Sequence, residues 1–182
     1  MTALRTCAAC LALLTIAGCI NSRPASEAMR RAEDTQTVVS NAVDCHRLGA
    51  PIDFEAHASG SVGGTVAPVG PPLNLRLRGL RTVLPVLVPG RQAKSENRFA
   101  GVIPFRIETA GTYAVLVASL AWADAGQADP PRFIQPQSFE WVTLCGKRFK
   151  SGQYTFESAK TYLVQLWDSP DRELEVMIRR LP

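Results

Sequence analysis

Apolar and polar residues alternate along much of the chain after residue 44. In the segments 52–58, 73–78, 103–108 and 174–179, an apolar residue occupies every second position, and most residues between them are polar. A period of two is typical of a β-strand that has one buried and one exposed face. Glycine and proline recur between these segments and indicate turns. The pattern therefore predicts a series of half-buried strands.

Two further segments are apolar on both faces, namely 82–88 (TVLPVLV) and 112–121 (TYAVLVASLA). Such a run is typical of a central strand that is covered on both sides. No amphipathic helical pattern of ten or more residues appears after residue 45. We therefore expect an all-β fold over residues 44–182, a single antiparallel β-sandwich domain of the jelly-roll or immunoglobulin-like type.

One stretch of the sequence has an echo later in the chain. PFRIETAGTYAVLV (104–117) aligns with QYTFESAKTYLVQL (153–166), which places Tyr113 against Tyr162. Each copy is predicted to form a hairpin of two strands joined by a tight turn. Both tyrosines are expected to be buried with their hydroxyls bonded to backbone, as is common in sandwiches. We interpret the echo as shared hairpin patterning rather than as a duplication.

The first part of the chain departs from the alternating pattern. Residues 7–18 form an apolar run that follows a single basic residue, Arg5. The run is too short for a membrane-spanning helix, which needs about 20 residues, and it fits the apolar region of a secretory signal. Residues 20–42 are polar and lack a core pattern. We therefore predict a signal peptide at 1–18 and a tether at 19–43, part of which has helix-forming composition.

The residues Ile16-Ala17-Gly18-Cys19 resemble the lipobox of bacterial lipoproteins. In that family the cysteine thiol takes a diacylglyceryl group, the signal is cleaved before it, and the new amine is acylated. The resemblance implies that Cys19 is the lipidated first residue of the mature chain. Ile20 follows in place of aspartate, which resembles the default sorting signal for the Gram-negative outer membrane. We expect a protein held by lipid in that membrane and facing the periplasm; the alternatives are an ordinary cleaved signal and a core strand.

The globular part carries two resemblances. Residues 105–115 resemble the F-x-V-x-x-x-G-x-Y-x-V hairpin of prepeptidase C-terminal and other carbohydrate-binding-like sandwiches. GTYAV at 111–115, AWAD at 121–124, Cys145 and the closing segment 162–181 together resemble small exported Gram-negative proteins of unknown function. The first resemblance implies a β-sandwich, and the second implies an exported β-sandwich.

The cysteines divide by role. Of the five in the chain, Cys7 and Cys10 leave with the signal, and a third carries the predicted lipid. The remaining pair, Cys45 and Cys145, would meet an oxidising compartment and is predicted to form a disulfide. It would close a loop of about 100 residues and contribute roughly 4–5 kcal/mol in the chain-entropy model. The alternative, a metal site that also includes His46, lacks the ligand spacing of a zinc motif.

Candidate catalytic residues are few. The chain has two histidines, and a non-haem iron centre requires two histidines and a carboxylate. Glu55 and His57 point to the same side of one predicted strand, and His46 is the one remaining imidazole. That side also carries Asp53 and lies opposite the apolar face, so solvated side chains are the simpler interpretation. We expect no catalytic residues and no cofactor, and a metal-dependent enzyme of the non-haem iron type is the alternative.

The charge of the chain argues against a nucleic-acid partner. The net charge is +4 and the pI about 9.0, and the Lys and Arg residues are scattered rather than clustered, as a nucleic-acid site requires. The partners that we expect are the membrane, through the N-terminal lipid, and an envelope protein or glycan.

Binding residues tend to lie in long loops on a rigid sandwich, and the chain has three candidate loops: 59–72, 94–97 and 121–137. Trp122 and Asp124 lie in the last of these and are candidate ligand contacts. Trp167 is a third, because strand alternation places it opposite the core-facing residues around it. Core or rim positions are more typical for Trp122 and Trp141. The sequence thus predicts a lipid-anchored, non-catalytic binding or structural module.

Overall fold

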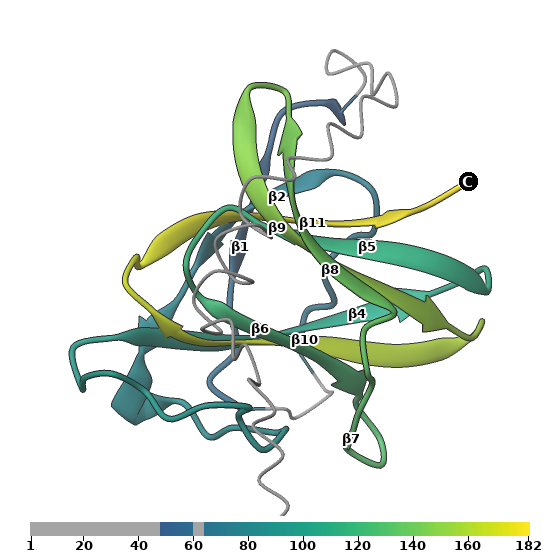
Figure 1. The fold of residues 1–182 in the computed structure, drawn as a ribbon. Helices are drawn as coiled ribbons and strands as arrows, with labels where there is room; N and C mark the ends of the chain where they lie inside the picture. The colour runs from purple at the N-terminus through teal and green to yellow at the C-terminus, as the bar shows by residue number, and fades with distance from the viewer. Residues whose placement is uncertain (1–47, 60–63) are drawn as a thin grey trace, which may run out of the picture. The chain divides into compact units, whose positions relative to one another are not determined.

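The computed structural model describes residues 48–59 and 64–182, which belong to one compact unit. They form two β-sheets that pack face to face (Figure 1). The six-stranded sheet has the order β1 (Ile52–Glu55), β2 (Pro72–Arg76), β11 (Glu173–Arg180), β5 (Gly111–Val117), β9 (Lys147–Phe156) and β8 (Ser138–Leu144). The five-stranded sheet has the order β3 (Arg78–Gly79), β4 (Phe99–Ile107), β10 (Lys160–Ser169), β6 (Trp122–Gln127) and β7 (Arg132–Phe133). The predicted all-β sandwich is confirmed.

The predicted alternation of side chains decides which residues form the core. Alternate residues of β2, β4, β5, β10 and β11 point between the sheets and are almost fully buried. An aromatic group fills the middle, where the ring centroids of Phe156 lie 4.5 Å from Tyr162 and 5.3 Å from Phe105. Tilted and edge-on aromatic contacts of this kind add about 0.5–1.5 kcal/mol each beyond the apolar area that they bury. The core therefore binds the two sheets at their centre.

The two copies of the sequence echo are not hairpins, and this prediction was wrong. β4 and β5 lie in different sheets, as do β9 and β10, so each copy is an arch that crosses from one sheet to the other. The arches pair with each other, because β4 pairs with β10 and β5 with β9. Tyr113 lies opposite Tyr154, and Tyr162 lies opposite Phe105. The alignment of the echo matches Tyr113 with Tyr162 and Phe105 with Tyr154, so it converts one of these pairs into the other. The two arches are therefore related by a local pseudo-two-fold axis.

The expected tyrosine hydrogen bonds are present in both arches. The hydroxyl of Tyr113 donates to the carbonyl of Thr109 at 2.6 Å. The hydroxyl of Tyr162 accepts from the backbone N–H of Glu157 at 2.8 Å. In each arch a buried tyrosine thus ties its strand to the preceding turn and satisfies its own polar atom.

The segment 82–88 is not a strand, contrary to the sequence prediction. Its first residue ends a short 3₁₀ helix, η2 (Leu80–Thr82), and the remainder runs without regular pairing. Pro85 interrupts it, and proline removes a donor that a central strand needs. Leu87 is buried, whereas Leu84 and Val88 are 72% and 92% exposed. The segment is therefore a partly buried covering loop.

The side chain of a glutamine makes hydrogen bonds to the backbone of the covering loop, which a neighbouring strand would otherwise make. Gln165 is fully buried and accepts hydrogen bonds at Oε1 from the backbone N–H of Val86 (2.7 Å) and of Leu87 (3.0 Å). Its Nε2 donates to the carbonyl of Leu87 at 2.8 Å. Leu87 also packs with Leu163 and Val102 in a small apolar cluster. These contacts hold the covering loop against the outer face of the five-stranded sheet, the face turned away from the other sheet.

Candidate functional site

The predicted lipidation site Cys19, the predicted signal and tether, and the residues Cys45 and His46 all lie outside the described residues. Within residues 48–59 and 64–182, no helix is long and apolar enough to span a membrane. The predictions for the N-terminal segments therefore stay predictions.

Cys145 lies at the tip of the β8–β9 hairpin. It is the first residue of a two-residue turn, with φ of 52° for Cys145 and 73° for Gly146, between the paired residues Leu144 and Lys147. Turns with two left-handed residues favour asparagine, aspartate and glycine, so a cysteine is unusual at this position. Leu48 packs against an apolar cluster together with Leu144. Cys45 lies outside the described residues, so the disulfide remains a prediction.

The candidate metal ligands on β1 and just after it have other contacts. Glu55 is exposed, and its Oε1 accepts from Nη2 of Arg78 at 2.8 Å. His57 is half-buried, its ring is stacked on Phe54 at 6.1 Å between centroids, and its backbone pairs with Val102. In the part of the chain that the structure describes, no three His, Cys, Asp or Glu residues are grouped to hold a metal ion. His46 lies outside this part, so the metal-dependent alternative is not tested.

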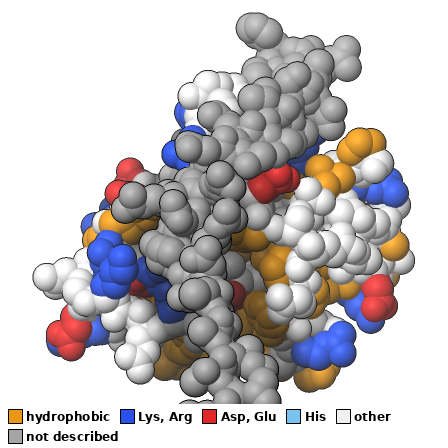
Figure 2. All heavy atoms as spheres, in the orientation of Figure 1, with side chains coloured by type: hydrophobic (Ala, Val, Ile, Leu, Met, Phe, Trp, Pro, Cys, Tyr) orange, Lys and Arg blue, Asp and Glu red, His pale blue; other side chains and the backbone are white. Residues whose placement is uncertain are grey.

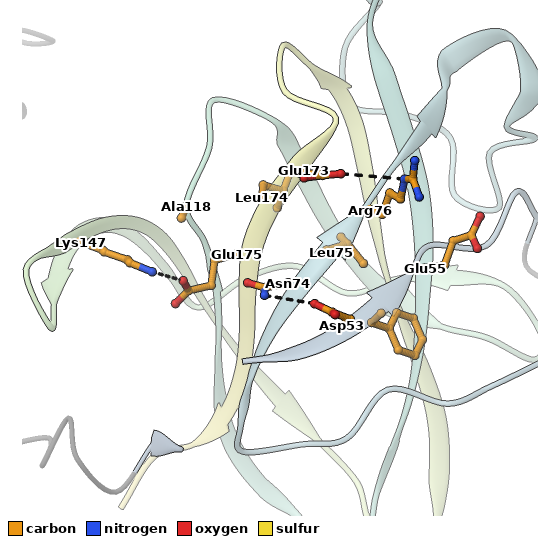
Figure 3. A pocket seen from close by; sticks show the side chains of 11 residues that line it. Asp53, Glu55, Asn74, Leu75, Arg76, Ala118, Lys147, Glu173, Leu174 and Glu175 are labelled. Atoms are coloured by element: carbon orange, nitrogen blue, oxygen red, sulfur yellow. Dashed lines mark hydrogen bonds and ion pairs between the residues drawn. The ribbon is translucent and has the colours of Figure 1, made fainter. Parts of the chain in front are cut away.

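An open groove of about 850 Å³ lies on the six-stranded sheet over β1, β2 and β11 (Figure 3). Each of its two cations pairs with a carboxylate of the lining: Lys147 with Glu175, and Arg76 with Glu173 at 3.9 Å. Asp53 accepts a hydrogen bond from Asn74 at 3.2 Å. Exposed pairs of this kind contribute little to stability, and both cations of the groove are already paired with a carboxylate. The groove is therefore the weaker of two candidate sites.

The three predicted ligand-contact residues are brought together on the other sheet. β6 and β10 are antiparallel neighbours, with Trp122 opposite Trp167 and Asp124 opposite Gln165. Ala123 and Ala125 face the core, so Trp122 and Asp124 point to the outer face of the five-stranded sheet. Trp122 is 37% exposed, so it is not a core residue, and its exposure is that of a rim position. The two alanines occupy the inward positions instead.

The indole of Trp122 is fixed by three neighbours. Its Nε1 donates to both carboxylate oxygens of Asp124, at 2.9 and 3.0 Å. The backbone of Gly90 lies so close to the ring that a Cβ added there would stand 2.9 Å from Nε1. The guanidinium of Arg91 lies 5.7 Å from the ring centroid, within the range of a cation–π contact. The ring is therefore partly exposed but immobilised.

Asp124 is a buried carboxylate with a supporting role. Its side chain is buried, with only 5% of the residue exposed, and burial raises its pKa above the ordinary value. The hydrogen bonds from Trp122 and from the backbone N–H of Gly90 at 3.5 Å oppose this shift. The geometry directs both oxygens at the indole, so Asp124 orients Trp122 rather than facing a ligand.

Asp168 was not found by sequence reasoning and connects the covering loop to this surface. It is buried, follows Trp167, and adopts a left-handed φ of 54°. Its carboxylate pairs with Arg91, lies 3.5 Å from Nε of Arg98, and accepts from the backbone N–H of Lys94 at 2.9 Å. Burial alone would raise the pKa of Asp168, but these hydrogen bonds and charges outweigh it and hold the pKa below its usual value. Its partners lie 74 and 77 residues away in sequence, so no local pattern marks it.

Comparison with protein-family models gives no match to this chain, and comparison with curated proteins gives none either. No residue role is therefore available from a relative. The candidate function rests on the sequence and on the geometry of the surface around Trp122 and Trp167.

Proposed function

We propose that this protein is a lipid-anchored envelope protein whose β-sandwich is a binding module facing the periplasm. The observation that carries the proposal is the indole of Trp122, a large apolar ring that is partly exposed and held by Asp124, Gly90 and Arg91. Ordering a side chain on binding costs about 0.5–1.5 kcal/mol. A ring that is already immobilised avoids most of this cost. Together with Trp167 across the strand pair, it offers a preformed contact surface.

The lipid anchor is supported by the sequence of residues 16–19. A single acyl chain gives marginal membrane binding, whereas the two or three chains of a lipoprotein give stable attachment. The segment 20–47 separates the anchor from the first described residue. Fully extended, it would span at most about 100 Å. Such a length allows the sandwich to work at a distance from the membrane surface.

Replacing Cys19 with alanine is expected to abolish incorporation of an alkyne-labelled fatty acid and to move most of the protein from the membrane fraction to the soluble fraction. The reason is that the thiol that carries the diacylglyceryl group is gone. The matched control is Cys10→Ala, which removes a cysteine of the predicted signal and should leave labelling unchanged. Full labelling of the Cys19→Ala protein would exclude the anchor.

Replacing Trp122 with alanine is expected to weaken binding of the full chain, in detergent micelles, to purified peptidoglycan sacculi by at least about tenfold, because central aromatic residues dominate binding surfaces. Sedimentation with the sacculi measures the effect. Phe133→Ala, which removes an exposed aromatic side chain on β7, is the control and should bind as the unaltered protein does. Equal binding by the Trp122→Ala protein would contradict the assignment of this surface.

A further inference from the structure

The six-stranded sheet carries a second apolar cluster on its outer face, the face turned away from the other sheet. Four residues of β5, β9 and β11 form its centre, and Leu116 lies opposite Met177 in the strand register. These four residues are only 1–4% exposed, which is as low as in the core. We call the centre and the five partly buried residues around it the outer apolar cluster: Ala114, Leu116, Phe149, Met177, Leu48, Ala118, Val142, Leu144 and Leu181.

The outer apolar cluster needs a covering layer. A sheet by itself leaves the ends of its outward side chains in water, because neighbours within one sheet touch only side by side. Eight of the nine cluster residues belong to strands of this sheet or directly follow one of them. Leu48 is the exception, since it precedes β1 and comes from outside the sheet. The low exposure therefore indicates a layer over the cluster, and Leu48 is part of that layer.

The position of Leu48 shows how the chain approaches the sheet. β1 begins at Ile52 and forms one edge of the sheet, and β8 forms the other edge. The cluster lies beyond β2, on β11, β5, β9 and β8. Leu48 packs against it although Ile52 is only four residues further along the chain. The chain that leads to β1 therefore comes over the outer face from the side of β8.

The residues before Leu48 have the composition and the length of such a cover. The stretch TVVSNAV at 37–43 contains three valines, whereas six of the seventeen residues at 20–36 are charged. Neighbouring strands lie about 4.8 Å apart, so the distance from β11 to β8 is about 15 Å. The eleven residues 37–47 reach at most about 40 Å when extended. They are long enough to cross all four strands.

Two other occupants fit the cluster less well. A second copy of the chain would find little apolar surface there, because the four central residues are buried within a single chain. A membrane with anionic lipids attracts basic surfaces, but the groove next to the cluster is lined by four carboxylates and two cations. On the face shown in Figure 2, Lys and Arg side chains form separate groups with other side chains between them. The chain's own segment is the occupant that these observations favour.

We infer that residues 37–47 form a strap that packs on the outer apolar cluster. The strap shortens the free tether to residues 20–36, which span at most about 60 Å. It also places the anchored end of the domain on the six-stranded sheet, whereas Trp122 lies on the outer face of the five-stranded sheet. The inference thus goes beyond the proposed function, because it assigns a second interaction surface that leaves the first one free.

Met177 reports on the strap, because peroxide converts accessible methionines to the sulfoxide. The test variant is Val38→Asp with Val39→Asp. Adjacent residues of an extended segment point to opposite sides, so one of the two charges meets the cluster in either register. We expect Met177 of the full chain to oxidise at least about tenfold faster in this variant, as measured by mass spectrometry. Leu84→Asp with Val88→Asp adds the same charges to exposed positions of the covering loop and should leave Met177 protected.

Three results would overturn the inference. Equal oxidation rates in the two double variants would show that the strap does not cover Met177, and oxidation of the unaltered protein at the rate seen in urea would show an open face. Protection that rises with protein concentration would assign the cover to a second copy. The Cys19→Ala protein is measured without detergent, and loss of protection there would assign the cover to lipid or detergent.

A second measurement uses the unaltered full chain and does not depend on the folding of a variant. Trypsin cleaves segments that are open or that unfold locally. We expect cleavage after Arg47 to be at least about tenfold slower than cleavage after Arg31, which lies in the free tether. Equal rates would contradict the strap. Sacculus binding should be unchanged in the Val38→Asp, Val39→Asp protein, so a failure of the strap and a failure of the Trp122 surface are seen separately.

Discussion

Replacing Cys145 with serine is expected to lower the free energy of unfolding by about 4 kcal/mol under oxidising conditions. A link to Cys45 would close a loop of about 100 residues, and removing it returns that conformational freedom to the unfolded chain. The serine keeps the size and polarity of the turn residue, so the hairpin tip itself changes little. Urea denaturation with and without a reducing agent measures the effect.

The same experiment contains its controls. The reductant should destabilise the unaltered protein by a similar amount and should leave the Cys145→Ser protein unaffected. Cys45→Ser should give the same loss, and the double variant should be no worse than either single one, because all three remove one link. Reaction of both cysteines with a thiol reagent in the native, unreduced protein would refute the pairing.

Replacing Asp168 with alanine is expected to cost about 2–3 kcal/mol of stability. The change leaves Arg91 and Arg98 without their shared counter-charge and the backbone N–H of Lys94 without its acceptor. Breaking a buried ion pair costs about 3–5 kcal/mol. We expect less here, because one layer of loop covers the carboxylate and solvent screens part of the interaction. Urea denaturation at neutral pH measures the loss.

Two variants make this prediction specific. Asparagine has the shape of aspartate, keeps one hydrogen-bond acceptor and tolerates a left-handed φ. The Asp168→Asn protein should therefore lose only the part of the stability that depends on the charge of the carboxylate. Glu108→Gln breaks the exposed pair with Arg106 at 3.0 Å and should cost less than about 1 kcal/mol. If Asp168→Ala were no more destabilising than Glu108→Gln, Asp168 would not hold the covering loop.

The contribution of Asp168 should depend on pH with a defined sign. Its pKa in the folded protein lies below the ordinary value. The stabilisation is therefore complete above the unfolded pKa, about 3.9, and is lost as pH falls through the lower folded pKa. The difference in stability between the unaltered protein and Asp168→Asn should accordingly be constant near neutral pH and shrink below about pH 4.

Much of the fold was predictable because strand alternation is local. The inward positions read from LNLRLR, IPFRIE and LEVMIR are buried, with Leu73, Ile103 and Val176 at the core. The backbone bonds of the two echo tyrosines were also predictable, since each hydroxyl reaches a residue only four or five positions away. Part of the candidate site was found in the same way, because alternation placed Trp167 on the side opposite the core.

The remaining parts of the site depend on partners distant in sequence. Arg91 meets Asp168 across 77 residues, and Gly90 meets Asp124 across 34. Neither contact leaves a local pattern. Trp122 belongs to the site because β6 and β10 are neighbours and because Gly90 and Asp124 hold its ring. The residues next to Trp122 in the sequence do not indicate which distant residues will contact it.

The sequence by itself determined the fold class, the inward and outward residues of the main strands, and the expectation of an N-terminal lipid anchor. All of these depend on short patterns in which each residue acts with its immediate neighbours. Only the tertiary structure decided that the echo forms crossing arches, that 82–88 is a loop held by Gln165, and that Gly90, Arg91 and Asp124 surround the indole of Trp122. A strand pattern states which face is apolar, but which strand pairs with it and which segment covers it depend on free energies summed over the whole chain.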